Sequence, residues 1–136
     1  PHVVRLKGTA RSLDDGVRDQ IEAGIQRVST GIATAMGATA EVDYQRGYPV
    51  TVNDAQSAEY ATEVARQIAG DVDPDFKPLM AGEDFSYMLN ERPGAYVFVG
   101  NGDTPMVHHP AYNFSDETIP AGSSWYAGMI EARMPA

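Results

Sequence analysis

The sequence contains no cysteine, so its 136 residues can form neither a disulfide framework nor a metal site built on thiolates. Basic residues are also scarce, because ten Lys and Arg against nineteen Asp and Glu give a formal net charge of −9. A chain of this charge repels the phosphates of nucleic acid. We therefore do not expect nucleic acid as a partner.

Long hydrophobic runs are absent as well. The longest apolar stretches, such as Ala95–Val99, are far shorter than the roughly 20 residues that span a bilayer. The N-terminal residues Pro1–Arg5 lack the hydrophobic region of a signal peptide. We expect no membrane partner, and the cytoplasm is the default location. No initiator Met precedes Pro1, which predicts a cut chain that starts within a strand.

What is present is the composition of an ordinary globular protein, with 43% apolar and 21% charged residues. Residues 3–12 and 40–44 alternate between apolar and polar types, which predicts two strands. Between them, apolar residues recur every three or four positions, which predicts an amphipathic helix that ends at Gly37. These apolar residues are Val17, Ile21, Ile25, Val28, Ile32 and Met36. The first unit is therefore expected to be strand, helix, strand.

The remainder predicts three helices and one strand. Asn53 or Asp54 can cap a helix whose buried face comprises Ala58, Ala61, Val64, Ala65 and Ile68. A short helix is expected at 84–90, a strand buried on both faces at 95–99, and a last helix with Pro120 in its first turn. Neither set of elements closes a sheet with both faces covered. Another chain or missing upstream sequence is expected to complete each half.

Three clusters could carry chemistry. His108 and His109 precede Pro110 on the loop before the last helix, and a neutral imidazole is a good ligand for a divalent ion. One ligand does not make a metal site, and a solvated surface loop is the simpler interpretation. Gly82 and Glu83 stand at a helix start, where Glu83 could line a ligand site or merely cap the helix. Arg11 could bind a carboxylate at two points or be merely solvated.

The three clusters occur together and in a known order. The segments "LKGTARSLDDGVRDQI", "YQRGYPVTVND", "MAGEDFSYMLNERPGAYVFVGNG" and "HHPAYNFSDETIPAGSSWYAGMI" resemble metal-dependent amidohydrolases of the M20 peptidase family, in the hippurate hydrolase and N-acyl-amino-acid amidohydrolase group. The resemblance covers essentially the whole chain. It implies an α/β fold in which residues 1–48 form the second half of a ferredoxin-like lid and dimerisation domain, and residues 49–136 form the C-terminal part of the zinc-peptidase-like catalytic domain.

The resemblance also implies the site. His108 matches the family's C-terminal metal ligand, His109 matches a variable neighbour, Arg11 matches the lid arginine that binds the substrate carboxylate, and Gly82 with Glu83 match the motif that lines the pocket. The implied cofactors are two divalent ions per intact site, zinc, manganese or nickel. The other ligands and the general-base Glu would lie upstream of Pro1, so no catalytic residue is assigned here.

The expected function is hydrolysis of N-acyl amino acids by the intact enzyme, a homodimer through its lid, with the missing N-terminal portion of the same polypeptide as a partner. This fragment alone is expected to be inactive. The alternative is a non-catalytic dimerisation or binding module, which predicts that His108 faces solvent without acidic or histidine neighbours. A free-standing ferredoxin-like regulatory domain ranks last, because the first unit offers two expected strands where four are needed.

Overall fold

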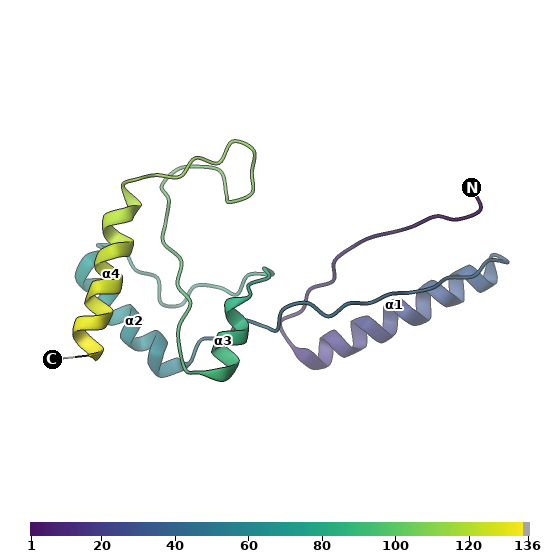
Figure 1. Ribbon diagram of the computed structural model, residues 1–136, viewed down its shortest axis with the longest axis horizontal. Helices are drawn as coiled ribbons and strands as arrows, with labels where there is room; N and C mark the ends of the chain where they lie inside the picture. Colours follow the sequence, from purple (N-terminus) through teal and green to yellow (C-terminus); the bar gives the residue numbers. More distant parts are fainter. Residues whose placement is uncertain (135–136) are drawn as a thin grey trace. The chain divides into compact units, whose positions relative to one another are not determined.

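The computed structural model describes residues 1–134, whose regular secondary structure consists of four helices (Figure 1). They are α1 (Asp15–Ala35), α2 (Ala55–Ile68), α3 (Phe85–Glu91) and α4 (Thr118–Arg133). The chain divides into two compact units, which we call unit 1 (residues 1–51 and 78–88) and unit 2 (residues 52–77 and the described residues from 89 onward). Among the described residues, none of the helices has the length and apolar character to cross a membrane.

The expected α/β fold class is wrong, because no residue between 1 and 134 lies in a strand. The ferredoxin-like half-domain and the sheet of an α/β catalytic domain are therefore not present in the described chain. The expected strands at 3–12, 40–44 and 95–99 lie in segments without regular structure. A strand exists only when a neighbouring strand pairs with its backbone groups, and the described residues supply no such neighbour. Their one backbone hydrogen bond between distant segments outside the helices joins Asp54 N to Gly94 O (3.0 Å).

Helix α1 confirms the helix expected from the apolar periodicity, and both of its ends follow from local chemistry. The carboxylate of Asp14 accepts a hydrogen bond from Val17 N (2.8 Å), which satisfies one of the free N–H groups of the first turn. At the other end Gly37 adopts a positive φ of 71°. This conformation lets Gly37 N donate to Thr34 O (3.1 Å) and Ala38 N donate to Ala33 O (2.8 Å). These two bonds form a Schellman motif, for which glycine is the preferred residue.

The apolar face of α1 is largely uncovered in the described structure. No residue of α1 is buried, and Val17, Ile32 and Met36 are 46%, 60% and 81% exposed. The chain after α1 runs back along the helix, where Arg18 Nη2 donates to Gly47 O (2.8 Å) (Figure 1). This contact is polar, so it fixes the returning segment without covering the apolar stripe.

Helix α2 confirms the second expected helix, and of the two expected caps Asp54 is the one used. Its Oδ1 accepts hydrogen bonds from Ser57 N and Ser57 Oγ, both at 2.8 Å. These bonds stabilise the ionised form, so the pKa of Asp54 lies below its ordinary value, chiefly through the backbone bond. Beside it, Asn53 makes two bonds to Tyr96, accepting from its N (2.8 Å) and donating to its O (2.9 Å).

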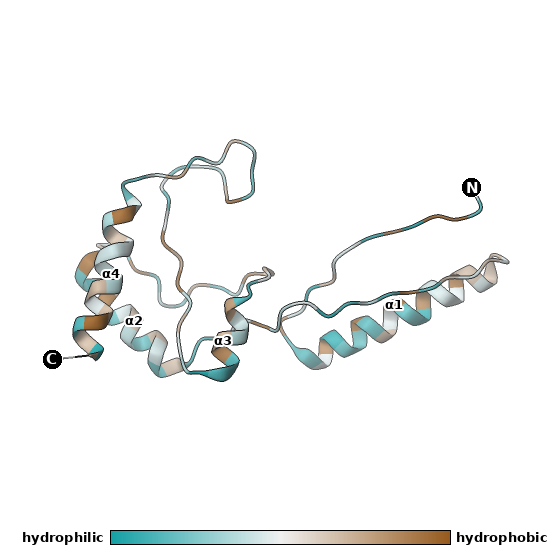
Figure 2. Cartoon of the chain, viewed as in Figure 1, coloured by the Kyte–Doolittle hydropathy of each residue, from teal (hydrophilic) through white to brown (hydrophobic). Residues whose placement is uncertain are grey.

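Helices α2 and α4 pack against each other and form the small core of unit 2, and both carry hydrophobic residues (Figure 2). Ala61 and Val64 of α2 are the buried apolar residues of the described chain. Trp125 Nε1 of α4 donates to Ala61 O (3.0 Å). Gly128 permits the close approach, since a Cβ at that position would lie 2.8 Å from Val64 Cγ1.

Candidate functional site

Unit 1 brings Arg11 and the segment that contains Gly82 and Glu83 together. The guanidinium of Arg11 donates through Nη1 to the carbonyl oxygen of Met80, although the two residues are 69 positions apart in the sequence. Gly82 lies against the ring of Tyr48, and a Cβ at position 82 would be 3.3 Å from Tyr48 Cδ2. The ring of Tyr48 in turn meets that of Tyr87 edge-on, with centroids 6.0 Å apart. Three of the four predicted site residues therefore occupy one neighbourhood within unit 1.

Glu83 has a clear local role at the start of α3. Its carboxylate Oε1 accepts from Phe85 N (3.2 Å), and its carbonyl accepts from Ser86 N (3.3 Å) and Ser86 Oγ (2.6 Å). Ser86 is fully buried, so these bonds satisfy polar groups that water does not reach. Glu83 thus caps the start of α3, which is the simpler of the two roles that the sequence left open. Its role in lining a substrate pocket stays a prediction.

His108 lies in unit 2, in a tight turn of the loop that precedes α4. His109 N donates to Met106 O (3.1 Å), which closes a four-residue turn with His108 in its third position. His108 has a φ of 71°, and among described non-glycine residues it alone has a positive value. A turn of type II requires such a φ at this position, and histidine is one of the side chains that tolerate it best. The turn holds the imidazole out into solvent, because His108 is exposed.

The two adjacent histidines differ in their bonding. His109 Nδ1 accepts a hydrogen bond from Ala111 N (3.1 Å), so one of its two ring nitrogens is used within the loop. The ring of His108 makes no hydrogen bond with the residues that the structure describes. His108 is therefore the imidazole of the pair whose lone pair is available to an external ligand.

The neck of this loop contains residues that the sequence analysis missed. Asn101 Nδ2 donates to Asn113 O (2.8 Å), and Asn101 Oδ1 accepts from Ser115 N (2.8 Å). Thr104 Oγ1 accepts from Asn113 N at 3.5 Å. We call Asn101 and its two backbone partners at 113 and 115 the loop clamp. The nearest signal in the sequence is the position of Asn101 between Gly100 and Gly102, which predicts a turn rather than a clamp.

A metal ion needs more donors than the described chain assembles. No group of three or more His, Asp or Glu side chains that could hold an ion occurs among residues 1–134. A catalytic zinc site uses about three protein ligands, and the exposed ring of His108 can supply one. Among the described residues, His108 therefore offers at most a single ligand and is not part of an assembled metal site. An exposed histidine without a ligand cluster is also what the binding-module alternative predicts.

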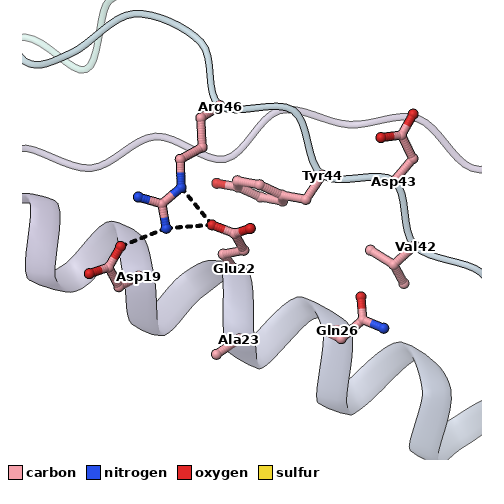
Figure 3. A pocket seen from close by; sticks show the side chains of 8 residues that line it. All are labelled: Asp19, Glu22, Ala23, Gln26, Val42, Asp43, Tyr44 and Arg46. Atoms are coloured by element: carbon pink, nitrogen blue, oxygen red, sulfur yellow. Dashed lines mark hydrogen bonds and ion pairs between the residues drawn. The ribbon is translucent and has the colours of Figure 1, made fainter.

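A second polar cluster in unit 1 lines an open surface pocket of about 600 Å³ between α1 and the segment that follows it (Figure 3). Arg46 Nη2 lies 2.6 Å from Asp19 Oδ1 and 2.5 Å from Glu22 Oε2, and its Nε donates to Glu22 Oε2 at 2.7 Å. Side-chain hydrogen bonds raise the pKa of Arg46, and the bond to Asp19 contributes more than the bond to Glu22. The sequence signal was the spacing of three between the two carboxylates, which places them on one face of the helix. Both carboxylates are used by Arg46, so this cluster attaches the segment to α1.

Comparisons with known proteins identify a family and several similar proteins. The model of the family described as peptidase family M20/M25/M40 matches residues 5–132. The chain is 31% identical to the hippurate hydrolase of Campylobacter jejuni over 129 residues, which is 93% of this chain and 34% of that protein. It is 30% identical to the N-acetylcysteine deacetylase of Bacillus subtilis over 128 residues, covering 93% of this chain and 33% of that protein.

A third relative is the N-acetyldiaminopimelate deacetylase of Oceanobacillus iheyensis, which is 32% identical over 126 residues. The match covers 93% of this chain and 34% of that protein. The chain thus spans about a third of the length of the curated relatives it matches. No solved structure matches the chain.

Proposed function

The chain belongs to peptidase family M20/M25/M40, and on that premise we propose that the protein is an amidohydrolase that cleaves N-acyl amino acids of the hippurate type. The observation that carries the proposal is the similarity along 93% of the chain to a hippurate hydrolase and two deacetylases. The names of these relatives describe one chemistry, the hydrolysis of an amide between an acyl group and the nitrogen of an amino acid. The acyl group is acetyl for the two deacetylases and benzoyl for hippurate, and the amino acid differs among all three, so the shared feature is an acylated amino acid.

His108 is the residue that we propose as a metal ligand. Its ring is exposed on a turn with a defined backbone, and it makes no hydrogen bond within the described chain. An imidazole in this state can donate its lone pair to zinc, manganese or nickel, of which we propose two ions per complete site. Bound divalent ions polarise an amide carbonyl and make a bound water more acidic. Since the described residues hold no full donor set, the other ligands would come from outside them.

Arg11, Gly82 and Glu83 are the residues that we propose for substrate binding. A guanidinium can bind a carboxylate through two parallel N–H groups, which suits the free carboxylate of an N-acyl amino acid. The bond from Arg11 to Met80 O holds the guanidinium beside the segment of Gly82 and Glu83. Gly82 keeps the space beside Tyr48 open, because a Cβ there would crowd the ring at 3.3 Å. These residues would orient the substrate rather than carry out the chemistry.

Two further parts of the proposal concern polypeptide partners. The apolar face of α1 is largely uncovered in the described structure, and the chain spans about a third of the length of its relatives. We propose that polypeptide equivalent to the remaining two thirds of these relatives covers part of this surface and supplies the missing metal ligands. We also propose a homodimer through residues 1–48.

The proposed activity is tested by incubating the native gene product that carries residues 1–136 with hippurate. We expect release of glycine and benzoate in equal amounts, loss of the reaction after treatment with a chelator, and recovery when a divalent ion is restored. N-Acetylcysteine serves as a second substrate with a different acyl group. Failure of the metal-replete protein to hydrolyse any N-acyl amino acid would contradict the proposal.

The binding-module alternative is favoured by one observation, the exposure of His108 without a ligand cluster among the described residues. It predicts a protein that binds no stoichiometric metal and hydrolyses no amide. Metal content measured on the same preparation therefore separates the two functions. One or two tightly bound ions per chain with chelator-sensitive hydrolysis would eliminate the alternative.

A further inference from the structure

Asn101 is the residue that closes the loop of His108. Its side chain bridges to two backbone groups on the far side of the loop, the carbonyl of Asn113 and the N–H of Ser115, both at 2.8 Å. The loop between these points, residues 102–114, contains the turn in which His108 has its positive φ. One amide group therefore joins the two ends of the segment that presents the imidazole.

The loop clamp also attaches the loop to a helix. The carbonyl of Ser115 accepts from both Thr118 N (3.0 Å) and Thr118 Oγ1 (2.8 Å) at the first turn of α4. Helix α4 is in turn packed on α2 through Trp125 and Gly128. Asn101 thus connects an otherwise irregular loop to the packed part of unit 2. A ligand on a loop is held accurately only when such supporting contacts fix the loop.

We propose that Asn101 is a positioning residue for the metal ligand His108. The inference rests on the proposed function, since it assumes that His108 binds an ion. An asparagine suits this place because its amide supplies one donor and one acceptor, which match the carbonyl at 113 and the N–H at 115. Aspartate would keep the acceptor and lose the donor, and alanine would lose both. Loss of the clamp releases residues 102–114, so the ring of His108 spends less time in the orientation that binds metal.

The test measures the affinity of the native gene product for Zn²⁺ by competition with a chromophoric chelator. The variants are Asn101→Ala, Asn101→Asp and His108→Ala, and the matched control is Asn113→Ala. The control removes the same type of side chain from the same loop but keeps the backbone carbonyl that Asn101 binds. Substitution of groups that orient metal ligands typically weakens metal binding by about 10- to 100-fold. We expect a loss in that range for Asn101→Ala, a smaller loss for Asn101→Asp, and less than a twofold change for Asn113→Ala.

The outcomes separate the inference from the function on which it rests. If His108→Ala weakens Zn²⁺ binding and Asn101→Ala binds Zn²⁺ like the wild type, the role of Asn101 is overturned and the proposed function stands. If His108→Ala binds Zn²⁺ like the wild type, the metal-ligand role of His108 is overturned and the role of Asn101 with it, whereas the proposed amide hydrolysis is tested separately with hippurate. Far-UV circular dichroism shows whether each variant keeps its helices.

A milder substitution keeps the inference testable if Asn101→Ala does not fold. Thr104→Val removes the hydroxyl that accepts from Asn113 N at 3.5 Å and leaves Asn101 in place. Because this contact supports the same loop neck but is long for a hydrogen bond, we expect a measurable loss of Zn²⁺ affinity that is smaller than the about 10- to 100-fold range expected for Asn101→Ala. Wild-type affinity in Thr104→Val would then count against the inference.

Discussion

Arg11 illustrates how one side chain can combine a structural contact with a proposed recognition role. Its Nη1 donates to Met80 O, which places the guanidinium beside the proposed substrate-binding segment. A hydrogen bond to a charged group contributes about 1.5–3 kcal/mol, equivalent to roughly 10- to 100-fold in affinity. We therefore predict that Arg11→Ala raises the KM for hippurate by about that factor and that Arg11→Lys, which lacks the two-point fork, recovers only part of it.

The substrate's carboxylate provides the control for this prediction. The primary amide of hippurate lacks the negative charge that Arg11 is proposed to bind, so its hydrolysis should be slow in the wild type and nearly unchanged in Arg11→Ala. Arg5→Ala removes an exposed cation from the same N-terminal segment and should leave both substrates unaffected. An equal loss for the two substrates would assign Arg11 a purely structural role.

Asp54 gives a prediction about pH. The bonds from Ser57 lower its pKa below the ordinary value of 3.8. A carboxylate whose pKa is lower in the folded state stabilises the fold above its unfolded pKa, and this contribution is lost as pH falls through the folded pKa. The measurement is helicity by circular dichroism from pH 5 to pH 2, an interval of about three units around this value. Over this interval the helicity of Asp54→Asn should decrease less than that of the wild type.

The control is Asp71→Asn, at an exposed carboxylate in the segment after α2. Its side chain makes no hydrogen bond with the described residues, so the variant should follow the wild-type acid profile. Identical profiles for all three proteins would show that the cap of α2 does not contribute to the acid sensitivity.

At the scale of elements, the packing of α2 on α4 depends on Gly128. A Cβ at this position would lie 2.8 Å from Val64 Cγ1, a distance that requires the Val64 side chain or the helices to shift. Overpacking of this kind costs about 1–3 kcal/mol. We predict that Gly128→Ala lowers the free energy of unfolding of the native gene product by that amount, measured by urea denaturation.

Gly122 is the matched control, because it lies on the same helix and a Cβ there would meet nothing within 4 Å. Alanine is a better helix former than glycine, so Gly122→Ala should stabilise the protein by up to about 1 kcal/mol. Val64→Ala should restore part of the loss in Gly128→Ala, since it removes the methyl group that is crowded. A gain in stability from both glycine substitutions would contradict the packing described here.

Helices α1 and α2 were predictable because their signals are local. Asp14 and Asp54 act as caps, Gly37 ends α1, and the apolar residues repeat at the helical period. The strands expected at 3–12, 40–44 and 95–99 were wrong, since an alternating pattern specifies a strand only if another strand pairs with it. The described chain offers no such partner.

The candidate site was likewise only partly predictable from the sequence. The approach of Arg11 to the segment of Gly82 agrees with their shared assignment from the resemblance, although their roles in binding stay predictions. The loop clamp of Asn101 was missed, because its partners are backbone groups 12 and 14 residues away. Side chain to backbone bonds over such distances leave no periodic pattern in a sequence. The sequence placed His108 on the loop before Pro110 and did not predict its φ of 71°.

At the scale of the whole molecule, the main feature is how little apolar surface the described residues bury. Ala61 and Val64 are the buried apolar side chains, whereas many large apolar residues, among them Leu6 and Met36, are exposed. We predict that residues 1–136 produced alone bind a hydrophobic dye such as ANS and lack a sharp thermal transition. They should also show weak or no hydrolysis of hippurate, because the described residues supply one proposed metal ligand.

The corresponding assay uses the purified chain with any longer form excluded by intact mass. Metal-dependent cleavage of hippurate by residues 1–136 alone would contradict the prediction. A cooperative unfolding transition without dye binding would show that the chain forms a sufficient core by itself.

The central claim is that His108 binds a metal ion and its neighbour His109 does not. The most direct measurement is the amount of metal retained per polypeptide after gel filtration of the native gene product and of the single variants His108→Ala and His109→Ala. Because His109 Nδ1 is already bonded to Ala111 N, His109→Ala should retain wild-type metal content and activity. His108→Ala should lose at least one ion and its hydrolysis of hippurate, whereas full metal content in His108→Ala would contradict the assignment.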